Sequence, residues 1–363
     1  MRTSTPTSLA PWLAVACFSA LTLHLSAASY SFTGAVDNNY LTAGNWSGSS
    51  IPDTANGDTA VISNGSAVTY VAGPDYTISN GGTLQVTNGS WTQTGGPAWI
   101  QLGAAGSGAG GNGHILVNGG TFNQGTAGNT PFNVAGTGNT FTISSGAANF
   151  TNQVTAVAGI TWNIAGGTTS MSGGPLTVQS GGNVQVSAGT LNVGGSLVLE
   201  NGSTWTQTGG TVTLGAGAEF DFNSLSGSSM SGGTLNVDKL VTGVNGPLGS
   251  TFSFSGGTIN IGATAFSGMY GADNADHPFS FTLGSLGVIN FLNGNTTTSQ
   301  VNAWLAAGGI QYNNTIDPSA FVVSQDGTTV SLSLVGAAIP EPASYGLIGG
   351  LVAVSALAYR RRR

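Results

Sequence analysis

The sequence predicts an all-β protein whose body is a right-handed parallel β-helix with β-rich caps at its N- and C-terminal ends. Three observations predict this fold class. Gly-Gly pairs recur along the chain, a short run of alternating apolar and polar residues follows many of them, and the pairs that begin at Gly209, Gly232 and Gly256 are 23 and 24 residues apart. Alternation with a period of two is typical of strands with one buried face. Paired glycines supply the positive φ of tight corners, and a fixed repeat length indicates stacked coils.

Residues 1–28 are predicted to form a secretory signal peptide. Arg2 gives a positive start, an apolar run extends from Leu9 to Leu25, and the small residues Ser26-Ala27-Ala28 follow, with cleavage expected after Ala28. The only cysteine, Cys17, lies inside this segment. After cleavage the chain would hold no disulfide, thiolate metal site or cysteine nucleophile.

Residues 29–76 are predicted to form the N-terminal cap, because a solenoid must cover its open ends. This segment contains Asn45-Trp46-Ser47, Pro52-Asp53 and a strand-like run from Gly57 to Ile62. The pattern resembles the start of exported bacterial β-repeat proteins with autotransporter-like passenger repeats.

Residues 77–265 carry the glycine-rich repeats of the predicted solenoid. If each coil has the length of the Gly-Gly spacing, Leu235 and Val237 point inward and stack on Ile259 and Ile261 of the next coil. Asn and Thr at the outward positions are then expected to form ladders along the stack. The alternative is an antiparallel sandwich or barrel, which needs two-residue hairpin turns between longer strands. The repeat units begin at Gly81, Gly119, Gly181, Gly209, Gly232 and Gly256.

Residues 266–338 lose the Gly-Gly-Thr rhythm and are predicted to form a β-rich C-terminal cap. Strand-like runs occur at Phe321-Val322-Val323 and Ser331-Leu332-Ser333-Leu334. One helix is expected between Ser299 and Ala307, around Trp304.

The chain closes with a tail of ordered features at residues 339–363. Pro340-Glu341-Pro342 precedes an uncharged stretch from Ala343 to Tyr359, and Arg360, Arg361, Arg362 and Arg363 follow. As a helix, those 17 residues would be about 26 Å long, near the lower limit for a membrane span. The sequence therefore predicts a single C-terminal transmembrane helix, with the arginine cluster in the cytoplasm and the body outside it.

The order of motif, apolar stretch and arginine cluster at the extreme end also resembles the PEP-CTERM sorting signal. That resemblance covers about 25 of the 363 residues, with Ile339 in place of the valine that is usual before the motif. It implies that an exosortase, with the secretion machinery, recognises Pro340, Glu341 and Pro342 and removes the tail. It further implies a host that makes exopolysaccharide, a membrane-anchored intermediate, and a final location at the cell surface or in the extracellular matrix.

The charge distribution excludes nucleic acid as a partner. Twelve of the thirteen acidic residues lie between Tyr30 and Ala338, where Lys239 is the only basic residue, so this body carries a net charge of −11. Nucleic-acid binding needs clustered Lys and Arg to replace phosphate counterions. Disorder is also disfavoured, because 40% of the residues are hydrophobic.

Few residues have the pattern of a catalytic or metal site. Glu219 and Asp221 are two apart on one predicted strand and therefore face the same side, where they would serve acid/base chemistry, bind Ca²⁺ or remain solvated carboxylates. Asp273, Asp276 and His277 lie together in a loop, but a plain polar loop is the favoured interpretation. His114 opens a predicted strand. No cofactor and no metal site is expected.

The favoured function is that of a non-enzymatic structural or adhesive protein associated with exopolysaccharide. The alternative is a carbohydrate-active enzyme, a polysaccharide hydrolase on a β-helix, with Glu219 and Asp221 as the weak catalytic candidates. Five tryptophans would stack on sugar rings if they were exposed, but core packing is the favoured interpretation of them: Trp46, Trp91, Trp99, Trp162 and Trp205.

Overall fold

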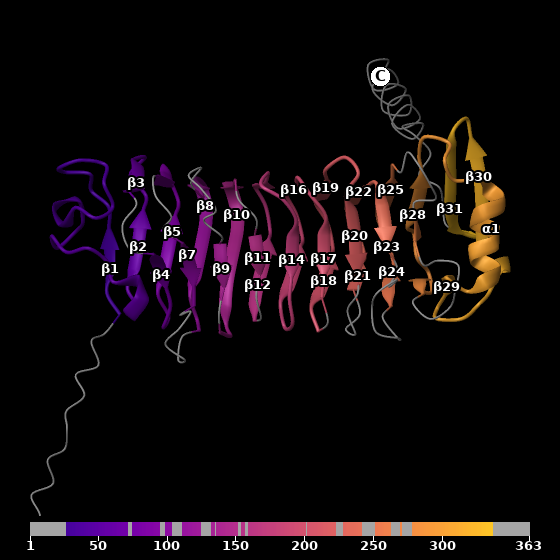
Figure 1. Cartoon of the computed structure of the whole chain (residues 1–363), viewed down its shortest axis with the longest axis horizontal. Coiled ribbons are helices and arrows are strands. Elements are labelled where there is room, and N and C mark those ends of the chain that lie inside the picture. Colours follow the sequence, from indigo (N-terminus) through magenta and orange to yellow (C-terminus); the bar gives the residue numbers. More distant parts are fainter. Residues whose placement is uncertain are drawn as a thin grey trace, which may run out of the picture.

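The computed structural model is an elongated stack of β-strand coils that advances from β1 at one end to α1 and a hairpin at the other (Figure 1). Successive coils pair in parallel, so the predicted parallel β-helix is confirmed and the antiparallel sandwich or barrel is wrong. Among the strands described, antiparallel pairing joins only β28 to β31 and β30 to β31. The structure describes residues 27–71, 75–94, 99–103, 111–124, 132–134, 136–151, 154–156, 159–200, 202–222, 228–241, 251–262, 269–270 and 278–336.

The described coils have three faces. The first face contains β2 (Thr59–Ile62), β5 (Thr83–Val86), the first halves of β8 (His114–Asn123) and β10 (Asn139–Phe150), β12 (Ile160–Ile164), β15 (Asn183–Val186), β18 (Thr204–Gln207), β21 (Ser228–Met230), β24 (Phe252–Phe254), β27 (Phe279–Phe281) and β29 (Ile310–Tyr312). The second face contains β3 (Ala67–Val71), β6 (Ser90–Thr94), the second halves of β8 and β10, β13 (Thr168–Met171), β16 (Thr190–Val193), β19 (Thr211–Leu214), β22 (Thr234–Val237), β25 (Thr258–Ile261) and β28 (Val288–Phe291).

The third face is a separate 9-stranded sheet, whereas the first two faces share one 22-stranded sheet because β8 and β10 contribute to both. The third face contains β4 (Tyr76–Ile78), β7 (Ile100–Leu102), β9 (Phe132–Val134), β11 (Val154–Ala156), β14 (Leu176–Val178), β17 (Leu197–Leu199), β20 (Glu219–Phe222), β23 (Lys239–Val241) and β26 (Met269–Tyr270).

The core is formed by alternate residues of every strand, which point into the interior. Leu235 pairs with Ile259 and Val237 with Ile261 on the next coil, and all four side chains are buried. The predicted inward register is therefore confirmed. Aromatic side chains also stack from coil to coil, as Trp91 does on Phe122 with ring centres 5.1 Å apart. Each coil thus buries the apolar side chains of its neighbour.

Glycine corners join the first face to the second and bring neighbouring coils into backbone contact. Gly210, Gly233 and Gly257 stack at this corner with φ values of 66°, 81° and 98°. A Cβ atom added at Gly233 would lie 2.5 Å from the carbonyl carbon of Gly209 on the preceding coil. Any larger residue at this position would combine left-handed strain with a clash against backbone.

The N-terminal end is closed by a polar loop over an aromatic cluster. β1 (Ser29–Ser31) pairs with β2, and the 3₁₀ turns at Ala43–Asn45 and Thr54–Asn56 lie nearby. Asn45 is fully buried, and its amide group donates to Asp37 Oδ1 (2.5 Å) and to the carbonyl of Asn39 (2.8 Å). Below this loop, Trp46 and Tyr40 pack edge to face. The parallel ladder already includes β2 and β3, so regular coils begin within the segment that the sequence assigned to the cap.

The C-terminal end is closed by a helix and a hairpin. α1 (Thr298–Ala307) confirms the predicted helix, and it begins with a capping box in which Thr297 and Gln300 bond each other's backbone N–H. A 3₁₀ turn (Pro318–Ala320) leads into β30 (Phe321–Asp326), which pairs with β31 (Thr329–Leu334). β31 then pairs antiparallel with β28, so the last edge of the second face is covered.

The fold prediction needs one correction, which concerns the transmembrane helix. Within the described ranges, no helix is long and apolar enough to cross a membrane, so that part of the prediction is wrong for the described structure. The stretch 343–359, on which the prediction was based, lies outside the described residues.

Two alanine substitutions distinguish the cost of left-handed backbone at a turn from the cost of a clash between neighbouring coils. Gly217 and Gly233 have similar φ values of 75° and 81°, but a Cβ at Gly217 would meet nothing within 4 Å. Gly217→Ala should lower the free energy of unfolding by about 1–2 kcal/mol, the cost of a left-handed L-residue. Gly233→Ala should lower the free energy of unfolding by this amount and by about 1–3 kcal/mol more, because its methyl group would overpack against the preceding coil. Denaturant unfolding of the full-length variants measures both, and equal losses would show that the coils do not meet at this corner.

The lowered pKa of Asp37 makes the stability of the N-terminal end depend on pH. Hydrogen bonds from the Asn39 backbone and from the Asn45 side chain lower the pKa of Asp37 below its ordinary value of 3.8. A lowered carboxyl pKa stabilises the fold above the unfolded-state value, and this stability is lost as the pH falls through the lowered pKa. Asp37→Asn should therefore destabilise the chain at neutral pH, and the difference from wild type should shrink below pH 3.8. Thermal unfolding across that range measures it, and a constant difference would contradict the assignment.

Candidate functional site

The acidic pair predicted from the sequence lies on the third face. Glu219 and Asp221 both point outward from β20, because Phe220 and Phe222 between and beyond them are buried in the core. Along the stack, Glu219 is in register with Lys239 of β23, and Asp221 with Val241. The pair is thus on one side of one strand, with the body's single lysine beside the glutamate.

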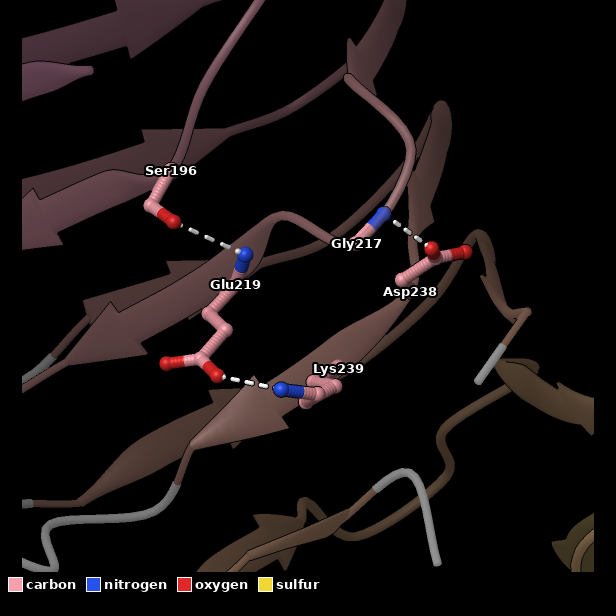
Figure 2. Close-up of polar contacts among 5 residues, drawn as sticks. All are labelled: Ser196, Gly217, Glu219, Asp238 and Lys239. Carbon is pink, nitrogen blue, oxygen red and sulfur yellow. Dashed lines mark hydrogen bonds and ion pairs between the residues drawn. The ribbon is translucent and has the colours of Figure 1, made fainter. Parts of the chain in front are cut away.

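Lys239 binds Glu219 directly (Figure 2). Its Nζ atom lies 2.6 Å from Glu219 Oε1, and the two side chains are 20% and 39% exposed. The Glu219 backbone N–H donates to Ser196 Oγ (3.1 Å), and the neighbouring Asp238 carboxylate accepts from the backbone N–H of Gly217. Hydrolysis of a glycosidic bond needs two carboxylates that flank the bond, one of them able to give up a proton. Here the Glu219 carboxylate is engaged by an ammonium group, and the carboxylate of Asp238, which is not one of the predicted pair, holds a turn.

The described residues offer little for a metal ion. No group of three or more His, Cys, Asp or Glu side chains in the described part of the chain is placed to hold one. The loop with Asp273, Asp276 and His277 lies outside the described residues. His114 Nδ1 lies 2.9 Å from Thr140 Oγ1, and burial lowers the pKa of His114, so its ring is neutral at neutral pH.

Four of the five tryptophans considered for sugar stacking are in the interior. Trp91, Trp162 and Trp205 are 0% exposed and Trp46 is 2% exposed, so core packing is confirmed for them. Only Trp99, which precedes β7 on the third face, is partly exposed, at 39%. The alternative of sugar stacking therefore stays open only for Trp99 among these five tryptophans.

The second face carries a continuous outward column of hydroxyl and amide side chains, here called the Asn/Thr column. In register from coil to coil, it consists of Thr69, Thr92, Asn123, Asn149, Ser170, Asn192, Thr213, Asn236, Asn260 and Asn290, and Ser331 continues it on β31. None of these residues is charged. The ladders expected at outward positions are thus present, on this face.

Hydrogen bonds link much of the column into a ladder. Asn260 Nδ2 donates to Asn236 Oδ1 (2.9 Å) and Asn290 Nδ2 to Asn260 Oδ1 (3.0 Å). At the two ends of this run, Asn236 Nδ2 donates to Thr213 Oγ1 (3.2 Å) and Ser331 Oγ to Asn290 Oδ1 (2.9 Å). The amides are therefore held in fixed orientations on the outer surface.

Two hollows open along the column, and sequence reasoning missed both. One, of about 270 Å³, is lined by Ser170, Met171, Ser172, Asn192, Val193, Gly194, Thr213, Leu214 and Gly215. The other, of about 470 Å³, is lined by Gly257, Thr258, Leu286, Val288, Asn290, Ser324, Ser331 and Ser333. The only sequence signal for them was the recurrence of Asn and Thr at the outward positions of the repeats, which marks the face and not the hollows.

The sorting residues are mostly outside the described structure. This applies to Pro340, Glu341 and Pro342 and to the arginine cluster at 360–363. The predicted cleavage residue Ala28 is described: its backbone N–H donates to Asp58 Oδ1 (2.9 Å) and its carbonyl accepts from Thr59 N (2.7 Å). Ala28 therefore lies against the first coil.

Comparison of the chain with protein-family models, with curated proteins and with solved structures finds no match in any of the three.

A double-mutant cycle tests the role of the Glu219–Lys239 pair. Because both side chains are partly exposed, their coupling energy should be about 0.2–1 kcal/mol and should fall when the salt concentration is raised to the molar range. The cycle uses Glu219→Gln, Lys239→Met and the double variant, with denaturant unfolding at low and high salt. A coupling of several kcal/mol that ignores salt would instead indicate a desolvated, functionally poised pair.

Proposed function

We propose that the chain is an exported, non-enzymatic structural or adhesive protein of the cell surface or extracellular matrix, associated with exopolysaccharide. The observation that carries the proposal is the Asn/Thr column, an uncharged line of hydroxyl and amide groups along one face of the solenoid. Such a surface offers many weak hydrogen bonds at a constant spacing, which suits a long repeating polymer. The column includes no ionisable side chain that would serve as a general acid or base or activate one of its hydroxyl groups as a nucleophile.

The environment of Glu219 weighs against the hydrolase alternative. Its carboxylate lies 2.6 Å from the Lys239 ammonium, so one of its oxygens is already engaged in an ion pair within the chain. A catalytic carboxyl group must instead be free to reach the glycosidic oxygen or an attacking water. Asp221, beside it, is in register with Val198 and Val241 of the neighbouring strands.

Residues 339–363 are proposed to be a sorting signal of the PEP-CTERM type, read by an exosortase. The support is the order of the motif and the arginine cluster, together with their position in the sequence shortly after the last described strand. β31, the last strand described, ends at Leu334, five residues before the Ile339 that opens the tail. A processing enzyme would therefore meet the motif directly after the C-terminal hairpin.

Processing of the tail is the measurable consequence. Mass spectrometry of surface protein from the native host should lack the peptide from Leu347 to Tyr359. Pro340→Ala/Pro342→Ala should abolish this processing, because it removes the rigid extended motif, whereas the matched tail variant Ser344→Ala should be processed normally. Surface protein that keeps its tail in most molecules, or equal processing of the double proline variant, would refute the sorting role.

A further inference from the structure

We propose that the second face binds an extended, neutral polysaccharide chain, which lies along the Asn/Thr column and seats sugar units in the two hollows that open beside it. This inference rests on the proposed association with exopolysaccharide and names the surface and the class of ligand. Three observations support it: the polar atoms of this face that are not already paired, the residues that line the hollows, and the charges around them.

The smaller hollow lies where the ladder is interrupted. Among the described residues, the side chains of Ser170 and Asn192 have no hydrogen-bond partner, although both stand in register within the column. Asn192, which lines the hollow, therefore keeps its full amide group, two N–H donors and one carbonyl oxygen, uncommitted. The edges of Met171, Val193 and Leu214 add apolar surface beside it.

The larger hollow lies at the C-terminal end of the column, against the hairpin. In the described structure the hydroxyl groups of Thr258, Ser324 and Ser333 bond no other residue. Leu286, which is 65% exposed, and Val288 supply an apolar wall. Its volume of about 470 Å³ is within the range of small-molecule sites.

This combination of groups matches a sugar. A pyranose ring has apolar C–H faces and a rim of hydroxyl groups that both donate and accept. The hollows offer uncommitted hydroxyls and amides next to aliphatic side chains, and each Asn in the ladder keeps one N–H and one lone pair after bonding its neighbours. Polymer hydroxyls would therefore find partners between the hollows as well as within them.

The charge of the body selects a neutral ligand. The column and the residues that line both hollows include no charged side chain. The body as a whole carries a net charge of −11, which repels uronate-rich or sulfated polymers. Attraction to an acidic polysaccharide would need basic side chains, and Lys239 is on the third face, bound to Glu219.

The separation of the hollows requires a chain of several sugars. Asn192 and Asn290 are four coil steps apart in the column. At the usual strand separation of 4.7–4.9 Å, this distance is roughly 19 Å. A disaccharide would occupy one hollow at a time, whereas a hexasaccharide would reach both and gain from the linkage.

The test measures binding of defined oligosaccharides to the full-length chain by calorimetry. The probes are the hexasaccharides and disaccharides of β-1,4-glucan and β-1,4-mannan, an alginate hexasaccharide, and polysaccharide extracted from the host. Asn192→Leu and Ser324→Leu remove uncommitted polar atoms from the two hollows. Thr177→Leu is the matched control, an outward residue of a short strand on the third face. Unfolding midpoints check that each variant is folded. If a leucine variant does not fold, the alanine variant at the same position, Asn192→Ala or Ser324→Ala, is used in its place.

At least one neutral hexasaccharide should bind tenfold or more tightly than its disaccharide, and more tightly than the alginate hexasaccharide. Asn192→Leu and Ser324→Leu should each weaken hexasaccharide binding at least tenfold, while Thr177→Leu binds as wild type does. Unchanged binding in both hollow variants would overturn the inference but leave association with exopolysaccharide intact. Failure of the wild-type chain to bind any probe, the host polysaccharide included, would overturn both.

Discussion

The close approach of backbone at the stacked Gly-Gly corners is the constraint on which the rest of this structure depends. At Gly233 a Cβ would lie 2.5 Å from the backbone of the coil before it, and at Gly209 it would lie 2.3 Å from the carbonyl oxygen of Ser187. Because the second glycine of each corner, as at Gly189, Gly210 and Gly233, meets the backbone of the preceding coil, the corner admits one alignment of each coil on the next. That alignment places Leu235 on Ile259 inside and Asn236 on Asn260 outside.

The alignment that the corners impose also places equivalent outward side chains in register on neighbouring coils. A residue type that recurs at one position of the repeat becomes a straight column, as Asn and Thr do on the second face. Neutral amides tolerate such stacking because each can donate to one neighbour and accept from the other, whereas like charges in register would repel. A surface made in this way repeats one weak contact many times, which suits adhesion to a polymer better than it suits catalysis at one place.

The sequence predicted the features that depend on the repeat. The pairs at Gly209, Gly232 and Gly256 predicted the coil length, and alternation after them predicted which of Leu235 and Asn236 faces inward. Features that depend on the lengths of the other links between faces, or on where the chain folds back, were not predictable in this way. Lys239 follows β22 after a single residue, Asp238, so the Glu219–Lys239 step on the third face is 20 residues and cannot be read from the 23-residue corner spacing. The larger hollow requires β31 to fold back antiparallel on β28, which local pattern does not specify.

The most direct test of the corner constraint is disulfide trapping of neighbouring coils in a Cys17→Ser background. Thr211 and Thr234 are in register on adjacent coils and point outward, at a separation that a disulfide can bridge. Thr211→Cys/Thr234→Cys should crosslink in high yield, the pair Thr211→Cys/Asn236→Cys should not, and adding Gly233→Ala should sharply reduce the yield of the first pair. Crosslinking of the shifted pair, or a yield that Gly233→Ala leaves unchanged, would contradict the claim that the glycine corners set the register.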